Sequence, residues 1–67
     1  MLFRNEERVR YEGQGLEKIG LVSGMEGEVV SCYRESVEVF YYDLKRTVHH
    51  KDFDMKMCLK KVKKHLA

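Results

Sequence analysis

The sequence has no proline, no tryptophan and only two cysteines, Cys32 and Cys58. Two cysteines are too few for the disulfide framework that stabilises many small secreted domains. The chain also turns charged at Arg4, before an apolar secretory signal could form. We therefore expect a cytoplasmic protein. No apolar run approaches the ~20 residues needed to span a membrane, so no membrane partner is expected.

Low-complexity tracts, repeats and linker-like segments are likewise missing. The length of 67 residues suits one domain, because a chain this short buries only about 60% of its unfolded surface. With 43% hydrophobic residues the chain is too apolar to be disordered. We expect a single domain over residues 1–67, with a β-barrel core at 6–53 and a basic amphipathic tail at 54–67.

Glycine is absent from most of the chain, since all five glycines lie between Gly13 and Gly27. Glycine is favoured where the backbone turns through positive φ or passes close to another strand. This segment is therefore expected to be the main loop. Before it, residues 8–12 alternate charged and apolar side chains, which is typical of a half-buried strand.

Two segments rich in β-branched and aromatic residues, 28–33 and 37–42, predict a hairpin with a three-residue loop at 34–36. Counting outward from that loop pairs Val29 with Tyr41 on one face and Val30 with Phe40 on the other. The first face is expected to form the core. Its members are Val29, Tyr33, Val37, Val39 and Tyr41. The second face leaves an outer strip of Val30, Phe40 and Tyr42, with Glu28 and Glu38 beside it.

A fourth strand is expected at residues 46–51, with Val48 facing inward. After this strand the spacing of apolar residues changes from two to three or four. The spacing of Met55, Leu59, Val62 and Leu66 predicts one stripe of a basic amphipathic helix, for which Asp54 would be the N-cap. A closing strand over residues 56–62 is the alternative. The fold class expected is mainly β: a small barrel or curled antiparallel sheet followed by this helix or strand.

The basic strand at 7–11, the G-x-x-G-x-V pattern that begins at Gly24 and the segment Val37–Phe40 together resemble an SH3-like small barrel of the KOW type. The resemblance covers residues 6–53. It implies about five strands curled on themselves, in a fold class that often binds RNA, DNA or a larger protein assembly. It also implies a short return strand at residues 59–62, in place of the helix.

Charge is divided along the chain. Residues 1–43 carry five Lys and Arg against nine Asp and Glu, a net charge of −4, whereas residues 44–67 carry eight against two, a net charge of +6. A basic tail on an acidic body can attract an anionic partner or can simply be solvated. The candidate nucleic-acid contacts are Lys45, Arg46, Lys51, Lys56, Lys60, Lys61, Lys63 and Lys64.

Catalytic, metal and cofactor sites have little support in the sequence. No motif brings a nucleophile, a base and an acid together. His49 and His50 are adjacent, so on a strand they point to opposite faces and cannot hold one ion. We expect surface histidines, no enzyme activity, no metal and no cofactor.

The function that the sequence favours is a small non-catalytic interaction module, suited to a larger assembly. It would bind a protein partner, or a second copy of itself, through Val30, Phe40 and Tyr42. If the tail stripe covers that strip, both become ordinary core. The alternative is an RNA- or DNA-binding barrel that uses the basic C-terminal face.

Overall fold

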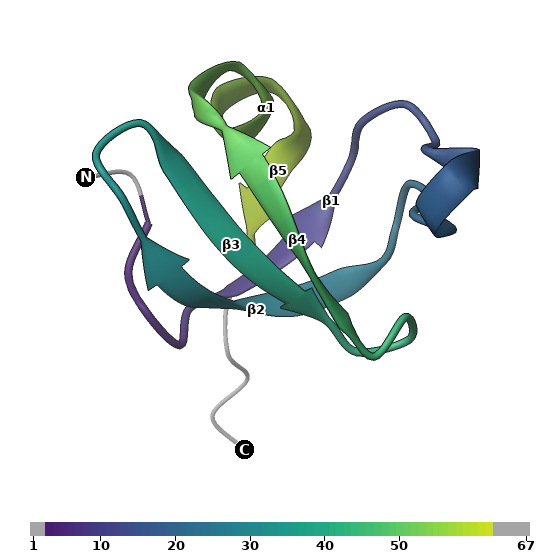
Figure 1. Cartoon of the computed structure of the whole chain (residues 1–67), viewed down its shortest axis with the longest axis horizontal. Coiled ribbons are helices and arrows are strands. Elements are labelled where there is room, and N and C mark those ends of the chain that lie inside the picture. Colours follow the sequence, from purple (N-terminus) through teal and green to yellow (C-terminus); the bar gives the residue numbers. More distant parts are fainter. Residues whose placement is uncertain (1–2, 63–67) are drawn as a thin grey trace.

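The computed structural model describes residues 3–62 and, within that range, all side chains except those of residues 52, 53 and 55. Its main element is one five-stranded antiparallel sheet with the strand order β4-β3-β2-β1-β5 (Figure 1). The strands are β1 (Arg8–Tyr11), β2 (Glu26–Cys32), β3 (Ser36–Tyr41), β4 (Arg46–Lys51) and β5 (Leu59–Lys61). The sheet curls but is not closed into a barrel. The mainly β fold class is therefore confirmed.

The core lies on the inner face of the curled sheet. Along β1 and β3 every second residue is buried, as the period of two requires. The buried apolar cluster consists of Phe3, Val9, Tyr11, Leu21, Val29, Val37, Val39, Tyr41 and Leu59. Each large apolar side chain removed from water in this way contributes about 1.5–3 kcal/mol. The predicted inward positions of Val29, Val37, Val39 and Tyr41 are confirmed.

The β2–β3 register differs from the prediction. Val29 pairs with Val39, not with Tyr41, and the register shifts between Val29 and Ser31, which places a β-bulge at Val30. Up to Val29 the pairing is shifted by two residues from the prediction, which preserves the alternation of side chains. Beyond the bulge it is shifted by one, so Ser31 stands opposite the outward Glu38, and Cys32, opposite Val37, packs against the core. Tyr33 was assigned to the core wrongly. It follows the end of β2 and is 51% exposed, with its hydroxyl donating to Glu38 Oε1.

The glycine-rich segment before β2 is a loop, as predicted. It contains a short 3₁₀-helix, η1 (Glu17–Ile19), and is anchored by the buried Leu21. Gly20 and Gly24 have φ values of 77° and 98°, which are unfavourable for other residues. Gly27 lies within β2, where a Cβ atom would overlap the carbonyl oxygen of Phe40. Both reasons for placing glycine in this segment are therefore present.

The C-terminal part contains both a helix and a closing strand. Strand β4 occupies the predicted residues, with Val48 half-buried against the core. Helix α1 (Asp52–Cys58) follows at once, so the predicted N-cap Asp54 lies inside the helix and Lys51 precedes it. The amphipathic helix predicted through Leu66 is wrong within the described residues, because it ends at Cys58; Leu66 itself lies outside them.

Strand β5 replaces the second half of the predicted helix. It pairs with β1, with Leu59 opposite Tyr11, and the pairing continues through Val62, whose N–H donates to the carbonyl oxygen of Arg8. Without β5, this edge of β1 would have unpaired backbone groups next to the core. Pairing with β1 therefore outweighs the helix propensity of the lysine-rich segment.

Candidate interaction surface

The outer face of the sheet carries the residues predicted to bind a partner, and two of them, Phe40 and Tyr42, form an aromatic pair. Phe40 and Tyr42 are both half-buried, and their ring centroids lie 6.3 Å apart in an edge-to-face arrangement. The guanidinium carbon of Arg8, from β1, lies 5.4 Å from the centre of the Tyr42 ring. We call Val30, Phe40, Tyr42 and Arg8 the outer patch. Aromatic and arginine side chains are enriched at the centres of protein interfaces.

Val30 reaches this face by an irregularity of the backbone. Because it is the extra residue of the bulge, it has no directly paired residue on β3, and its side chain is 42% exposed. The predicted pair of Val30 and Phe40 is therefore not formed. Glu28 stands opposite Phe40 instead. The outer patch thus consists of an aromatic pair, an arginine and a separate exposed valine, and the Glu28 carboxylate lies beside it.

The predicted cover of this strip by the C-terminal stripe is not present in the described part of the chain. Leu59 packs into the core on the inner face, where it is 6% exposed. Helix α1 also reaches the inner side, since Asp54 approaches the buried His50. Phe40 and Tyr42 consequently remain partly open to solvent.

Two of the candidate nucleic-acid contacts are paired with carboxylates. On β5, Lys60 Nζ lies 3.9 Å from Glu12 Oε1, and Lys61 Nζ lies 3.5 Å from Glu7 Oε2. Lys61 also lies 5.7 Å from the centre of the Phe3 ring. The acidic body therefore partly neutralises the basic segment. Such exposed pairs stabilise the fold little, but they lower the positive potential offered to a phosphate.

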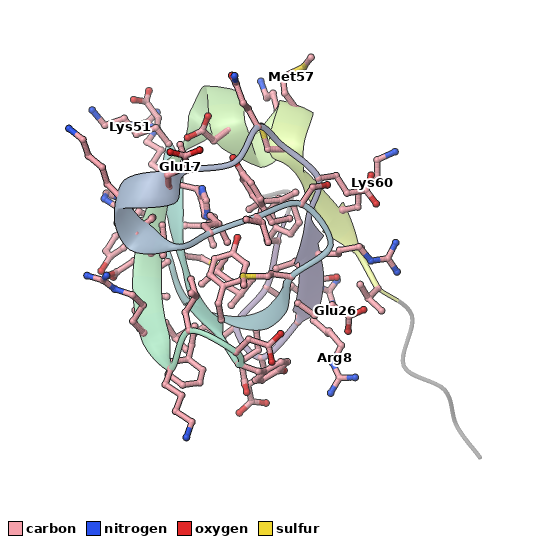
Figure 2. The ribbon with its side chains drawn as sticks, turned by 90° about the vertical axis from the view of Figure 1, so that its right-hand side faces the viewer. Arg8, Glu17, Glu26, Lys51, Met57 and Lys60 are labelled. Carbon is pink, nitrogen blue, oxygen red and sulfur yellow. The ribbon has the colours of Figure 1, made fainter. Side chains whose placement is uncertain are left out.

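The other basic candidates are distributed over the molecule. Lys45 and Arg46 are exposed at the β3–β4 turn, and Lys51 is exposed at the opposite end of β4. Lys56 is exposed on α1. Figure 2 shows Lys51 and Lys60 on opposite sides of the molecule, in keeping with β4 and β5 being the two edges of the sheet. Lys63 and Lys64 lie outside the described residues.

A buried polar cluster was missed at the sequence level. His50, expected at the surface, is 1% exposed, and its Nε2 forms a 2.8 Å hydrogen bond with the Tyr41 hydroxyl. Its ring stacks on Tyr11 at 5.7 Å, and its Nδ1 lies 3.9 Å from Asp54 Oδ2. Burial lowers the pKa of His50, against the opposing effect of the Asp54 carboxylate. The alternation of β4 contains the missed signal, because His50 lies two residues after the inward Val48.

Burial also raises the pKa of two further groups in this region, Tyr41 and Cys58. The Tyr41 hydroxyl is buried, and burial raises its pKa well above the ordinary value of 10.0, which keeps it protonated. Cys58 is half-buried, and burial raises the pKa of its thiol too, so the reactive thiolate is disfavoured. Among residues 3–62, no group of three His, Cys, Asp or Glu residues is arranged to hold a metal ion.

Comparisons with protein-family models, with curated proteins and with solved structures find no match for this chain. Within the described range, no helix is both long enough and apolar enough to cross a membrane.

Proposed function

We propose that this protein is a small non-catalytic interaction module of the SH3-like, KOW-type class, and that it binds a protein partner through the outer patch. The observation that carries the proposal is the pair of Phe40 and Tyr42, half-open on the outer face with Arg8 over the tyrosine ring. A partner that covers these side chains gains apolar burial and a desolvated cation–π contact.

The strand order of the sheet supports the SH3-like class. A three-stranded meander, β2-β3-β4, is extended by β1 and then by a short closing strand that pairs with β1. The same order is compatible with the SH3-like pattern that the sequence resembles. Two free thiols, Cys32 and Cys58, support a reducing compartment such as the cytoplasm.

Binding of RNA or DNA is the competing function. Arg8 over the Tyr42 ring, with Phe40 beside that ring, would suit base stacking, and several lysines could contact phosphates. Glu28 stands opposite Phe40, however, and Glu38 lies on the same face of β3. Because these carboxylates repel phosphate, the outer patch favours a protein partner.

Affinity capture from the native cell, with and without nuclease, tests the proposal. We expect partner proteins to survive nuclease treatment and to be lost with the double variant Val30→Ser/Tyr42→Ser. The matched control is Val22→Ser, since Val22 is 48% exposed against 42% for Val30 but lies in the glycine-rich loop. The control should retain every partner.

Two results would contradict the proposal. Equal capture by the outer-patch variant and the control would remove the outer patch as the binding surface. Recovery of RNA or DNA, with affinity lost in a Lys45→Glu/Arg46→Glu/Lys51→Glu variant and a flattened salt dependence, would establish the nucleic-acid function instead.

A further inference from the structure

We infer that the free edge of β4 is a second binding surface, which pairs with an extended acidic segment of a partner protein by adding a sixth strand to the sheet. The sheet order leaves two edges, β4 and β5, among the described residues. The inference does not depend on the proposed function, because the β4 edge is separate from the outer patch.

The two edges differ in their protection. Strand β5 has three residues, two of them lysines, and a short charged strand is a poor template for pairing. Strand β4 has six residues and pairs with β3 in an uninterrupted register from Arg46 to Lys51. A regular strand of that length, without a bulge or a proline, is suited to accept another strand.

The hydrogen-bond pattern identifies the backbone groups that are available. The N–H of Lys45 donates to the carbonyl oxygen of Tyr41, while the N–H of Tyr42 donates to Glu26 on β2. Tyr41 therefore directs its backbone groups toward β4, and so do Val39 and Val37 by alternation.

The residues on β4 that pair with these three are Arg46, Val48 and His50. The N–H groups of the intervening Thr47, His49 and Lys51 point away from β3, and all three residues are exposed.

The positive charge at both ends of β4 indicates an acidic strand as the partner for this edge. Arg46 and Lys51 flank the edge, about 17 Å apart at the rise of an extended strand. Within the described part of the chain neither forms an ion pair, in contrast to Lys60 and Lys61 on the other edge. A strand with a carboxylate at each end, five residues apart, would meet both cations while its backbone pairs with β4.

A second copy of this chain is a poorer occupant. Two β4 strands can pair antiparallel only with outward-facing residues opposite each other, for example Thr47 opposite Lys51 and His49 opposite His49. Strand β4 contains no carboxylate, so a second copy offers no ionic partner to Arg46 or Lys51. Two edges that are both positively charged also repel each other, which favours an acidic strand over a second copy.

The test uses the 67-residue chain and six-residue peptides, capped at both ends, in which alternating valine and threonine are flanked by glutamates. Amide NMR titration and hydrogen exchange are the measurements. Binding should protect the N–H groups of Thr47 and His49. Replacing both glutamates by glutamine should weaken binding about tenfold, as expected for the loss of two exposed ion pairs.

Two N-methylated isomers of the peptide test strand addition directly. One carries methyl groups on the alternate amides that face β4, and the other carries them on the amides that face away. Only the isomer with methyl groups on the amides that face β4 should lose binding, because those amides can no longer donate to the strand. A charge swap, Arg46→Glu/Lys51→Glu in the protein, should abolish binding of the glutamate peptide and create binding of a lysine-ended peptide. The Val30→Ser/Tyr42→Ser variant should bind both isomers like the wild type.

The inference is overturned if both N-methylated isomers bind equally, or if the shifts fall on Phe40 and Tyr42 instead of β4. It is also overturned if the protein alone is a dimer whose Thr47 and His49 amides are already protected. Neither result depends on whether the outer patch binds its own partner, so failure of one surface can be told from failure of the other.

Discussion

At the scale of single residues, Gly27 has the tightest surroundings of the glycines in this chain. Its position in β2 brings it so close to β3 that a Cβ atom would overlap the Phe40 carbonyl oxygen. Backbone atoms cannot give way as a flexible side chain can. We therefore expect Gly27→Ala to destabilise the fold by about 1–3 kcal/mol, measured by urea denaturation.

Gly15→Ala is the matched control for this change. The nearest atom to a Cβ at Gly15 is the carbonyl oxygen of Leu21 at 3.8 Å, an ordinary contact distance. Its effect should stay within about 0.5 kcal/mol. Equal effects of the two substitutions would show that β2 and β3 are not in close contact at Gly27.

At the scale of elements, β5 determines whether the C-terminal segment belongs to the fold. Leu59 is 6% exposed in the core, opposite Tyr11. Leu59→Asp buries a carboxylate without a partner and should cost more than about 3 kcal/mol, with a large fall in Tm. Met57→Asp, two residues earlier on α1, should cost less than about 0.5 kcal/mol because Met57 is 65% exposed. An unchanged Tm for Leu59→Asp would mean that this segment is a free arm.

At the scale of the whole molecule, His50 links stability to pH, because it lies among groups from four elements. Tyr41 (β3), Tyr11 (β1) and Asp54 (α1) surround it, and His49 is its neighbour on β4. Cys58, also on α1, acts on the two tyrosines. Burial lowers its folded-state pKa below the ordinary value of 6.5, so the folded protein favours neutral His50. The unfolded chain then takes up a proton first as the pH falls.

We therefore expect stability to be full above about pH 7 and to fall as the pH drops through about 6.5 toward the folded-state pKa. The measurement is the free energy of unfolding against pH for the wild type and two variants. His49→Gln, at an exposed site, should keep the dependence. Asp54→Asn should extend it to lower pH, because it removes the carboxylate that raises the pKa of His50. A wild-type curve that is flat between about pH 7 and pH 5 would contradict this role.

The sequence by itself determined which residues of the main strands face the core. Val29, Val37, Val39 and Tyr41 follow a period of two, which depends only on the local geometry of an extended chain. The same alternation placed Phe40 and Tyr42 together on the outer face. Glycine content located the loop, since positive φ and close backbone approach are local demands.

Only the tertiary structure decided the pairings between distant segments. The bulge that isolates Val30 arises from the β2–β3 register, and the end of α1 at Cys58 arises from the pairing of β5 with β1. Carboxylates from the N-terminal half reach Lys60 and Lys61 on β5. The contacts of β5 join residues far apart in the chain, whose energies of pairing and burial outweigh local propensity and leave no periodic signal in the sequence.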